Sequence, residues 1–387
     1  FDGNLFANDA LNNGAAYAII DNPQVNLSDR CILVENTLHA LQELAKLHRI
    51  HVRAKIIGIT GSNGKTTTKE LIGKVLSSTY KTYTTRGNLN NHIGVPLTIL
   101  SIENDTDFAV VEMGANHVHE IAELCMIAKP DFGIITNIGK AHLEGFGGYE
   151  GVVKAKSELY DYVRQNNGTL FVNRDNPLLV NLSIGIPSHC YGTSSEADCR
   201  GEIAGNTPYL YVHWSFGTLK GKIKTNLIGD YNFENIMAAI CIGLHFGVEP
   251  GTINRAIASY IPDNNRSQWL KTGNNTVILD AYNANPSSMK AAMSNFHQIE
   301  APDKMLILGD MMELGEHSLE EHGNIVHMLN DLDIKNVILI GDLFFQADQQ
   351  KFALHFNDHA EAEQWLSKNP VKNKTILIKG SRKMQLE

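Results

Sequence analysis

Apolar and polar positions alternate in blocks along the centre of this 387-residue chain. Short apolar runs at 56–59, 108–111 and 132–135 have the length of buried strands. Each run ends in a polar or glycine-containing turn, and residues with helical spacing follow, as at 65–76. Strand, turn and helix in repeated order predict an α/β fold built on parallel sheets.

The chain before residue 55 predicts a smaller α/β piece. We expect short strands at 15–20 and 31–34, separated by a turn at 21–23. A helix at 37–51 carries leucines at 38, 41, 44 and 47. This spacing places the leucines on one face, and we expect that face to pack in a core.

Two changes of pattern follow the central blocks. Residues 190–228 contain alternating segments that are typical of antiparallel hairpins. The segment 261–266 interrupts the pattern, and beyond it four apolar strands predict a second doubly wound sheet of Rossmann type, at 277–279, 305–308, 337–340 and 375–378. This part lacks a G-x-G-x-x-G motif, so a dinucleotide cofactor is not indicated. We therefore predict three domains, at 1–54, 55–262 and 263–387.

Composition narrows the class of protein. Hydrophobic residues make up 43% of the chain and charged residues 19%, which are ordinary globular values. The net charge of −9 and the lack of a basic block argue against a nucleic-acid partner. The sequence contains no apolar run of about 18 residues, so we expect no membrane insertion. The five cysteines are scattered and odd in number, so we expect no disulfide framework and a reducing cytoplasm.

The stretch from Lys55 to Lys69 carries the strongest chemical signal. A buried strand leads into a glycine-containing turn, and a helix starts at Lys65. In this geometry backbone N–H groups and the helix dipole hold a polyphosphate, while a hydroxyl can bind Mg²⁺. The general phosphate-loop signature has glycine where this chain has Ile59, so the loop is a shorter form. We predict an ATP site formed by Thr60, Gly61, Ser62, Asn63, Gly64, Lys65 and Thr66.

A metal site is predicted at the same edge of the sheet. Glu112 ends one buried strand, and His142 lies in the turn after the next one. Ligands of open α/β sheets bind at the carboxyl ends of the strands, where Thr66 also lies. One carboxylate, one hydroxyl and phosphate oxygens suffice for Mg²⁺. Histidine is a less usual partner of this ion, so His142 is the weaker part of the prediction.

Other polar residues allow more than one interpretation. The amide-rich loop 85–96 is either an ordinary turn cluster or part of a site. Asn232 and Asn235, on the first turn of an alanine-rich helix, could contact an adenine edge or could cap the helix. By composition alone, Lys156 is one more helix lysine.

Taken together, the motifs resemble one family, the Mur ligases, which are ATP-dependent amide-bond ligases of cytoplasmic peptidoglycan precursor synthesis. The short phosphate loop 60–68 matches the family, which accounts for Ile59. Further stretches resemble the member that adds D-alanyl-D-alanine rather than the one that adds the third residue: 87–96, 282–286, 308–315 and 379–382. Two small departures are Ala281, where the family often has a second acid, and Lys383, where it has glycine.

The resemblance implies a three-domain α/β protein: an N-terminal UDP-sugar-binding domain, a central ATPase domain and a C-terminal Rossmann-like domain. The chain starts at Phe1 rather than Met and stops soon after the strand at 374–379. We therefore expect both terminal domains to be partial, and the uridine contacts to lie before Phe1.

By position, the resemblance also implies roles for single residues. Lys65 would hold the β- and γ-phosphates, Thr66 and Glu112 one Mg²⁺, and His142 a second Mg²⁺. Lys156 falls where the family has a carbamylated lysine, which would give the second ion an oxygen ligand. The remaining implied contacts are Asn232 and Asn235 with adenine, Arg266 with the phosphates, and Asp280 and Tyr282 with the ribose. Arg382 and the loop 309–315 would help to hold the incoming dipeptide.

The implied activity is the joining of D-alanyl-D-alanine to UDP-N-acetylmuramoyl-tripeptide through an acyl phosphate, by a cytoplasmic monomer. The sequence leaves open whether the third residue of the tripeptide is diaminopimelate or lysine. Alternatives are another ligase of this fold, such as the third-residue-adding enzyme or folylpolyglutamate synthase, and a nucleotide-binding regulatory module. Glu112, His142 and Lys156 are all present, which disfavours the module.

Overall fold

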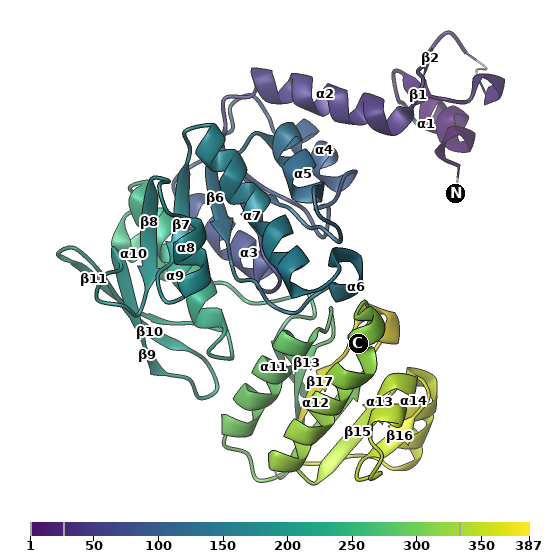
Figure 1. Ribbon diagram of the computed structural model, residues 1–387, viewed down its shortest axis with the longest axis vertical. Helices are drawn as coiled ribbons and strands as arrows, with labels where there is room; N and C mark the ends of the chain where they lie inside the picture. Colours follow the sequence, from purple (N-terminus) through teal and green to yellow (C-terminus); the bar gives the residue numbers. More distant parts are fainter. Residues whose placement is uncertain (1, 26–27, 333) are drawn as a thin grey trace.

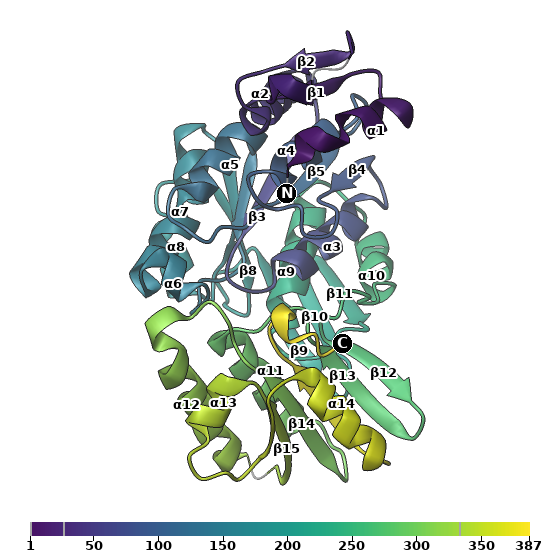
Figure 2. The same cartoon turned by 90° about the vertical axis from the view of Figure 1, so that its right-hand side faces the viewer.

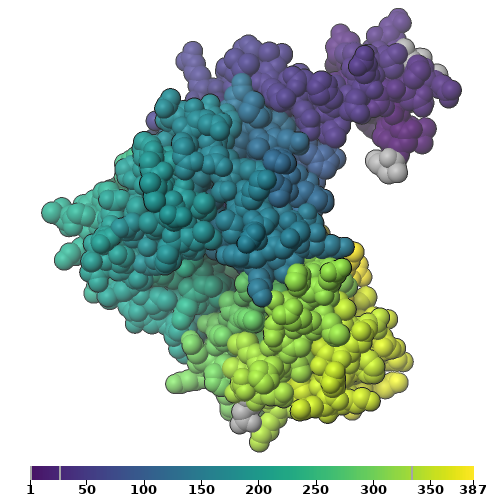
Figure 3. Space-filling model, in the orientation of Figure 1, coloured from purple at the N-terminus to yellow at the C-terminus, as the bar shows by residue number. Residues whose placement is uncertain are grey.

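The computed structural model describes residues 2–25, 28–332 and 334–387. It is a three-domain α/β structure in which the parts follow one another along the long axis in chain order (Figures 1 and 2). A narrow connection joins the N-terminal part to the rest, whereas the central and C-terminal parts touch directly (Figure 3). Among the described residues, no helix is both long enough and apolar enough to cross a membrane.

The described residues of the N-terminal part form α1 (Ala7–Asn12), the parallel strands β1 (Ala18–Ile20) and β2 (Cys31–Leu33), and α2 (Thr37–His51), with short 3-10 turns at Gly3–Phe6 and Pro23–Val25. Asn36 caps α2 by accepting the backbone N–H of His39. The helix has the predicted bounds, but the predicted core role is wrong for two of its leucines, whereas Leu38 and Leu41 are half-buried. Leu44 and Leu47 are 44% and 55% exposed, and Ala45 is the buried residue. The reason is that α2 contacts the central domain through α4 and α5 with its other face, by way of Gln42, His48 and Arg49.

The central domain is built on a nine-stranded sheet of order β11-β10-β9-β8-β7-β6-β3-β5-β4. Its strands are β3 (Lys55–Thr60), β4 (Thr82–Thr84), β5 (Phe108–Glu112), β6 (Phe132–Ile135), β7 (Thr169–Asn173), β8 (Ser188–Gly192), β9 (Cys199–Gly205), β10 (Tyr211–Phe216) and β11 (Leu219–Lys224). The pairs from β4 to β9 are parallel, and β9, β10 and β11 pair antiparallel. The hairpin prediction, which rested on the alternating segments 209–214 and 220–227 within 190–228, is therefore confirmed by the antiparallel strands β9–β11. Strand β8 at the start of this region is parallel to both neighbours.

Helices cover both faces of this sheet. They are α3 (Lys65–Leu76), α4 (Gly94–Leu100), α5 (Glu120–Ala128), α6 (Leu143–Phe146), α7 (Tyr149–Gln165), α8 (Pro177–Leu182), α9 (Asn232–His245) and α10 (Pro250–Ala258). Adjacent residues of β3 point to opposite faces, so Ile56 packs with α4, α5 and α7, and Ile57 packs with α3, α9 and α10. The near-continuous apolar strands follow from this burial on both sides.

The C-terminal domain has a six-stranded sheet of order β12-β13-β17-β14-β15-β16. Its elements are β12 (Gln268–Thr272), β13 (Asn275–Asp280), α11 (Pro286–Gln298), β14 (Lys304–Gly309), α12 (Ser318–Asp331), β15 (Asn336–Ile340), α13 (Asp342–Ala347), β16 (Leu354–Phe356), α14 (His359–Lys368) and β17 (Thr375–Lys379). The four predicted strands are present. The two edge strands, β12 and β16, were not predicted because they are polar or only three residues long.

Candidate active site

The turn between β3 and α3 has the geometry of an anion-binding loop. Gly61 and Gly64 adopt φ angles of 146° and 79°, a region that favours glycine. A Cβ at Gly61 would lie 2.0 Å from Thr136 Oγ1, and one at Gly64 would lie 2.6 Å from Asn235 Oδ1. Ile59, in contrast, is a fully buried strand residue. The short loop therefore needs its two glycines for space and backbone angle, and needs none at position 59.

Lys65 and Thr66 open helix α3 at the end of this loop. The ammonium of Lys65 donates to the backbone carbonyls of Gly61, at 2.6 Å, and Ser62, at 3.4 Å. Burial lowers the pKa of Lys65, and nearby Arg266 lowers it further against the raising effect of Glu112. Lys65 is half-buried, and among the described residues its hydrogen bonds go to backbone carbonyls alone, which leaves its charge available for an anion.

Glu112, at the end of β5, is held beside the loop. Its carboxylate accepts from Thr66 Oγ1 at 3.0 Å and from Asn90 Nδ2 at 2.8 Å, and Lys69 Nζ lies 3.8 Å away. Glu112 and Lys69 are each 2% exposed. The predicted pair Thr66 and Glu112 is thus brought together, and sequence reasoning missed Asn90 and Lys69. The amide-rich loop 85–96 was the signal for Asn90.

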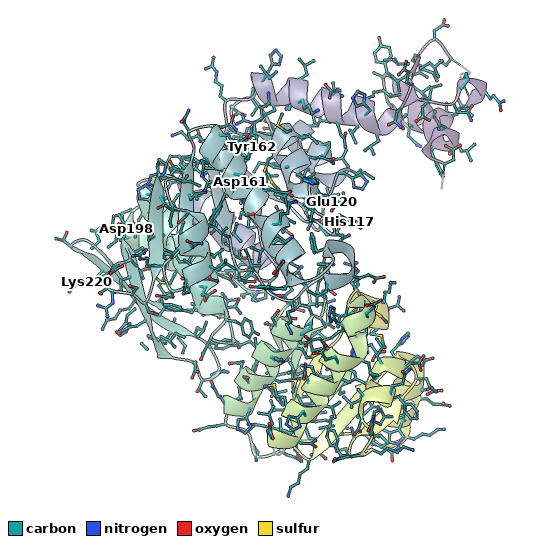
Figure 4. All side chains as sticks on the ribbon, in the orientation of Figure 1. His117, Glu120, Asp161, Tyr162, Asp198 and Lys220 are labelled. Atoms are coloured by element: carbon teal, nitrogen blue, oxygen red, sulfur yellow. The ribbon has the colours of Figure 1, made fainter. Side chains whose placement is uncertain are left out.

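A cavity of about 690 Å³ opens at this edge and is lined by the central and C-terminal domains. The predicted residues that line it are Ser62, Asn63, Gly64, Lys65, Thr66, Glu112, His142, Asn232, Asn235, Arg266, Asp280 and Tyr282. Thr60, Gly61 and Lys156 are outside this lining. Glu120 also lines the cavity, and it lies beside His117 at the start of α5 (Figure 4). The outer strands that carry Lys220 are far from this region (Figure 4).

Asn232 and Asn235 are buried side chains that support the loop. Thr68 Oγ1 donates to Asn235 Oδ1 at 2.9 Å, and Asn235 Nδ2 donates to Asn232 Oδ1 at 2.9 Å. Helix α9 has Tyr231 at its N-cap position and no side-chain cap bond, so the alternative that these residues cap the helix is wrong. Their shared position between α3 and α9 fixes the helix behind the phosphate loop.

The C-terminal domain contributes an aromatic and charged group of side chains. The guanidinium of Arg266 lies 3.8 Å from the centroid of the Tyr282 ring, and that of Arg382 lies 5.1 Å from it. Asp280 accepts from the backbone N–H of Ser267 at 3.1 Å and from Lys379 Nζ at 2.6 Å. Asp280 therefore already has partners, whereas Arg266 Nε is buried without one among the described residues.

Lys156 lies on α7 and is 2% exposed. Its ammonium is 5.2 Å from the centroid of the Phe146 ring. Burial, together with the charge of Lys65, lowers the pKa of Lys156 to about 7. An interpretation as an ordinary solvated helix lysine is therefore wrong, because the side chain is buried and burial favours its neutral form.

The cavity has no preassembled metal cage. Among the described residues, no group of three or more His, Cys, Asp and Glu side chains could hold a metal ion. Thr66 and Glu112 would supply a hydroxyl and a carboxylate, and Mg²⁺ commonly takes its other ligands from phosphate and water. His142 lines the same cavity and contacts Glu313 of the C-terminal domain. The donor set fits a metal that arrives with a nucleotide.

Comparison with known proteins agrees with this geometry. The Mur ligase middle domain matches residues 59–243, and the Mur ligase, glutamate ligase domain matches residues 265–382. The chain therefore belongs to the Mur ligase family.

The proteins that are similar to this chain include ligases that are named for the same two substrates. The UDP-N-acetylmuramoyl-tripeptide--D-alanyl-D-alanine ligase of Bacillus subtilis (strain 168) is 35% identical over 403 residues, covering 100% of this chain and 86% of the relative. The crystal structure of MurF from Acinetobacter baumannii matches with a TM-score of 0.89 and 29% identity, over 100% of this chain and 86% of that one. MurF from Thermotoga maritima in complex with ADP gives a TM-score of 0.87 and 27% identity, over 100% and 90%.

Proposed function

We propose that this protein is an ATP-dependent ligase that joins D-alanyl-D-alanine to UDP-N-acetylmuramoyl-tripeptide. The observation that carries the proposal is the phosphate loop with its half-buried Lys65, placed in a cavity that a second α/β domain completes. The likeness to MurF chains over the full length of this one supports the choice of substrates. The complex of a relative with ADP supports ATP as the phosphate donor.

The anionic reactants explain the charges of the cavity. In the proposed first step, the terminal carboxylate of the tripeptide attacks the γ-phosphorus, which gives an acyl phosphate and releases ADP. In the second step, the free amine of the dipeptide attacks the acyl carbon, an amide forms, and inorganic phosphate and a proton leave. Lys65 and Arg266 would neutralise charge on the transferred phosphoryl group, which is the main protein contribution in such reactions.

We further propose that two Mg²⁺ ions act here. Thr66 and Glu112, 3.0 Å apart, would hold one ion, and His142 with a carbamylated Lys156 would hold the other. Bound Mg²⁺ supplies charge neutralisation at the phosphates. Lys156 suits carbamylation because only a neutral amine adds CO₂, and its pKa of about 7 keeps part of it neutral.

A substitution at Lys156 tests the carbamate. We expect Lys156→Ala to reduce ligation by at least ~100-fold, because a metal ligand is removed. Formate or acetate, which can occupy the space of the lost carboxylate, should restore part of the rate. Lys154→Ala on the exposed side of the same helix is the matched control. Full activity of the Lys156 variant without added acid would refute the carbamate.

The assay that tests the main proposal measures ADP release from ATP with UDP-tripeptide and one amine acceptor at a time. D-alanyl-D-alanine should support turnover, whereas lysine, diaminopimelate and glutamate should not. Turnover with one of the amino acids would favour the third-residue-adding ligase or a folylpolyglutamate synthase instead. ADP release that no acceptor increases would favour a regulatory module. Paired tripeptides with diaminopimelate or lysine would identify the preferred third residue.

We also propose a monomer acting in the cytoplasm. The substrates named for the relatives are small molecules, and a complete cavity forms within one chain. The cysteines are scattered along the chain and odd in number, which favours a reducing compartment over a disulfide framework. Sedimentation of the purified protein at several concentrations tests the monomer.

A further inference from the structure

Two loops with unusual backbone angles meet across the cleft between the central and C-terminal domains. His142, just before α6, has a φ angle of 52°, and Glu313, between β14 and α12, has a φ angle of 67°. Neither residue is glycine, so both positions carry local strain, which in proteins is concentrated at functional sites. Figure 1 shows α6 directly above the C-terminal domain.

The side chains of these two residues touch. His142 Nδ1 lies 2.5 Å from Glu313 Oε2. Nδ1 is a buried atom that forms no hydrogen bond of regular geometry among the described residues, so the Glu313 carboxylate is its close charged neighbour. Phe146 of the same loop packs edge-on to the imidazole, at 6.4 Å between ring centroids. The central domain thus supports the ring by an apolar contact, and the C-terminal domain brings a charge to one nitrogen.

A second ion pair joins the segment before His142 to the C-terminal domain. Lys140 lies two residues before His142, and Glu321 lies at the start of α12. Lys140 Nζ is 2.6 Å from Glu321 Oε1. A Cβ at Gly315 would lie 3.0 Å from the Cβ of Glu144, so the backbones also approach closely. The Lys140 bridge connects the domains without contacting the imidazole. It is therefore a natural reference for the effect of closure alone.

We infer that Glu313 is a positioning residue for His142, reaching from the C-terminal domain to hold Nδ1 of the imidazole so that Nε2 serves the cavity only when the domains are together. The inference rests on the proposed function for its role in turnover. A carboxylate beside one ring nitrogen fixes the proton there and leaves the lone pair on the other nitrogen. That lone pair can then bind a divalent cation at the cavity.

This arrangement connects chemistry to domain position. When the C-terminal domain moves away, Glu313 moves with it, and the Nδ1 atom of His142 loses its described charged neighbour. The imidazole then loses its fixed tautomer. Closure is a known way for a ligand-binding cleft to complete its set of working groups. Here the working group is His142 of the central domain, and Glu313 of the C-terminal domain supplies the carboxylate that orients it.

The experiment compares Glu313→Gln with Glu321→Gln. We expect Glu313→Gln to lower kcat by ~10–100-fold with the KM for ATP within about twofold, because neighbours that orient a metal-ligating histidine have effects of this size. Glu321→Gln removes the other bridge, so it should raise substrate KM values and leave kcat near that of the wild type. Glu313→Asp keeps the charge with a shorter reach, and should give an intermediate kcat.

A second readout needs no substrate. In nucleotide-free protein labelled with ¹⁵N-histidine, the His142 resonance is identified by its loss in His142→Gln. We expect the protonated-Nδ1 tautomer in the wild type and in Glu321→Gln, and a mixture of tautomers in Glu313→Gln. An unchanged tautomer in Glu313→Gln, or equal kinetic effects of the two glutamine variants, would overturn the inference. Because the resonance requires no turnover, a wild type that fails to ligate would reject the proposed function alone.

Discussion

At the carboxyl edge of the central sheet, Lys65 hydrogen-bonds, among the described residues, only to backbone carbonyls of its own loop. At the carboxyl edge of the C-terminal sheet, Lys379 pairs with Asp280 at 2.6 Å. Lys379 is 2% exposed and Lys65 is half-buried, and both line the same cavity. The difference lies in their partners. The charge of Lys65 is available to a ligand, whereas the charge of Lys379 holds strand β17 to strand β13 and to the segment that links the two domains. Similar sheets can thus divide the work of binding and support.

The carboxylates show the same division. Glu112 faces the cavity with a hydroxyl and an amide as partners. Asp310, after β14, instead accepts the backbone N–H groups of Leu343 and Phe344 at the start of α13, and buried His322 lies 3.7 Å away. One acid is placed for a ligand, and the other closes a helix terminus inside its own domain.

The largest expected effect separates the two lysines. Lys65→Met should lower ADP formation by ~1000-fold or more, because the phosphoryl group loses its cation. The same variant should keep nearly all of its stability. Lys379→Met should lose about 3 kcal/mol of unfolding free energy, because Asp280 loses its cationic partner. Steady-state kinetics and urea unfolding of both variants check this, and a destabilised Lys65→Met would contradict the contrast.

Lys156 is a second lysine of the central domain, and the burial of its charge should lower the stability of the folded protein. Its folded pKa of about 7 lies below the ordinary lysine value of 10.5, so the unfolded chain binds the proton more readily. Stability should therefore rise with pH between about 7 and 10.5. In CO₂-free buffer at pH 7, Lys156→Met should be more stable than the wild type by about 2–4 kcal/mol, a gain that vanishes near pH 10.5. Added bicarbonate should stabilise only the wild type, and equal responses would remove the role of Lys156.

The acid of the C-terminal domain should show a smaller, purely structural effect. Asp310→Asn should cost about 2 kcal/mol, because charge-assisted bonds to the start of α13 are weakened. Burial lowers the pKa of His322, so protons favour the unfolded chain as the pH falls below the ordinary value of 6.5. His322→Gln should flatten this loss between pH 7 and 5 in urea titrations. A steeper pH dependence in the variant would contradict the assignment.

The smallest effect concerns a bond that crosses the cleft. Asn285 caps α11 and donates to Asn63 Oδ1 of the phosphate loop at 2.8 Å. Asn285→Ala should cost about 1 kcal/mol and raise the KM for ATP about twofold to fivefold. Asn176 caps α8 in the central domain outside the cavity lining, so Asn176→Ala should cost similar stability and leave that KM unchanged. Equal KM values in both variants would show that the loop does not depend on Asn285.

The parts of the site that were predictable are contiguous in sequence. The loop and helix at 60–66 could be predicted because a turn, its glycines and the following lysine occur within a few residues. Glu112 followed from its place at a strand end. Lys69, Asn90 and Glu313 were missed because their contacts depend on how loops from separate segments come together.

The fold shows a similar limit. Buried central strands gave strong apolar runs, whereas the edge strands β12 and β16 carry polar or few residues. The leucines of α2 have correct helical spacing, but spacing alone does not say what covers a face. Lys156 shows the converse, since no local pattern marks a lysine whose burial comes from the packing of α7.

Helix α2 has a mechanical consequence for the N-terminal part. Arg49, near its C-terminal end, donates to the carbonyls of Ala128 and Lys129, while the helix start adjoins the strand β2. Its 15 residues form a rod of about 22 Å. A tilt of about 5° at the clamped end displaces the far end by about 2 Å. Small rotations of α2 where it contacts the residues beside α5 therefore produce larger displacements of the whole N-terminal part.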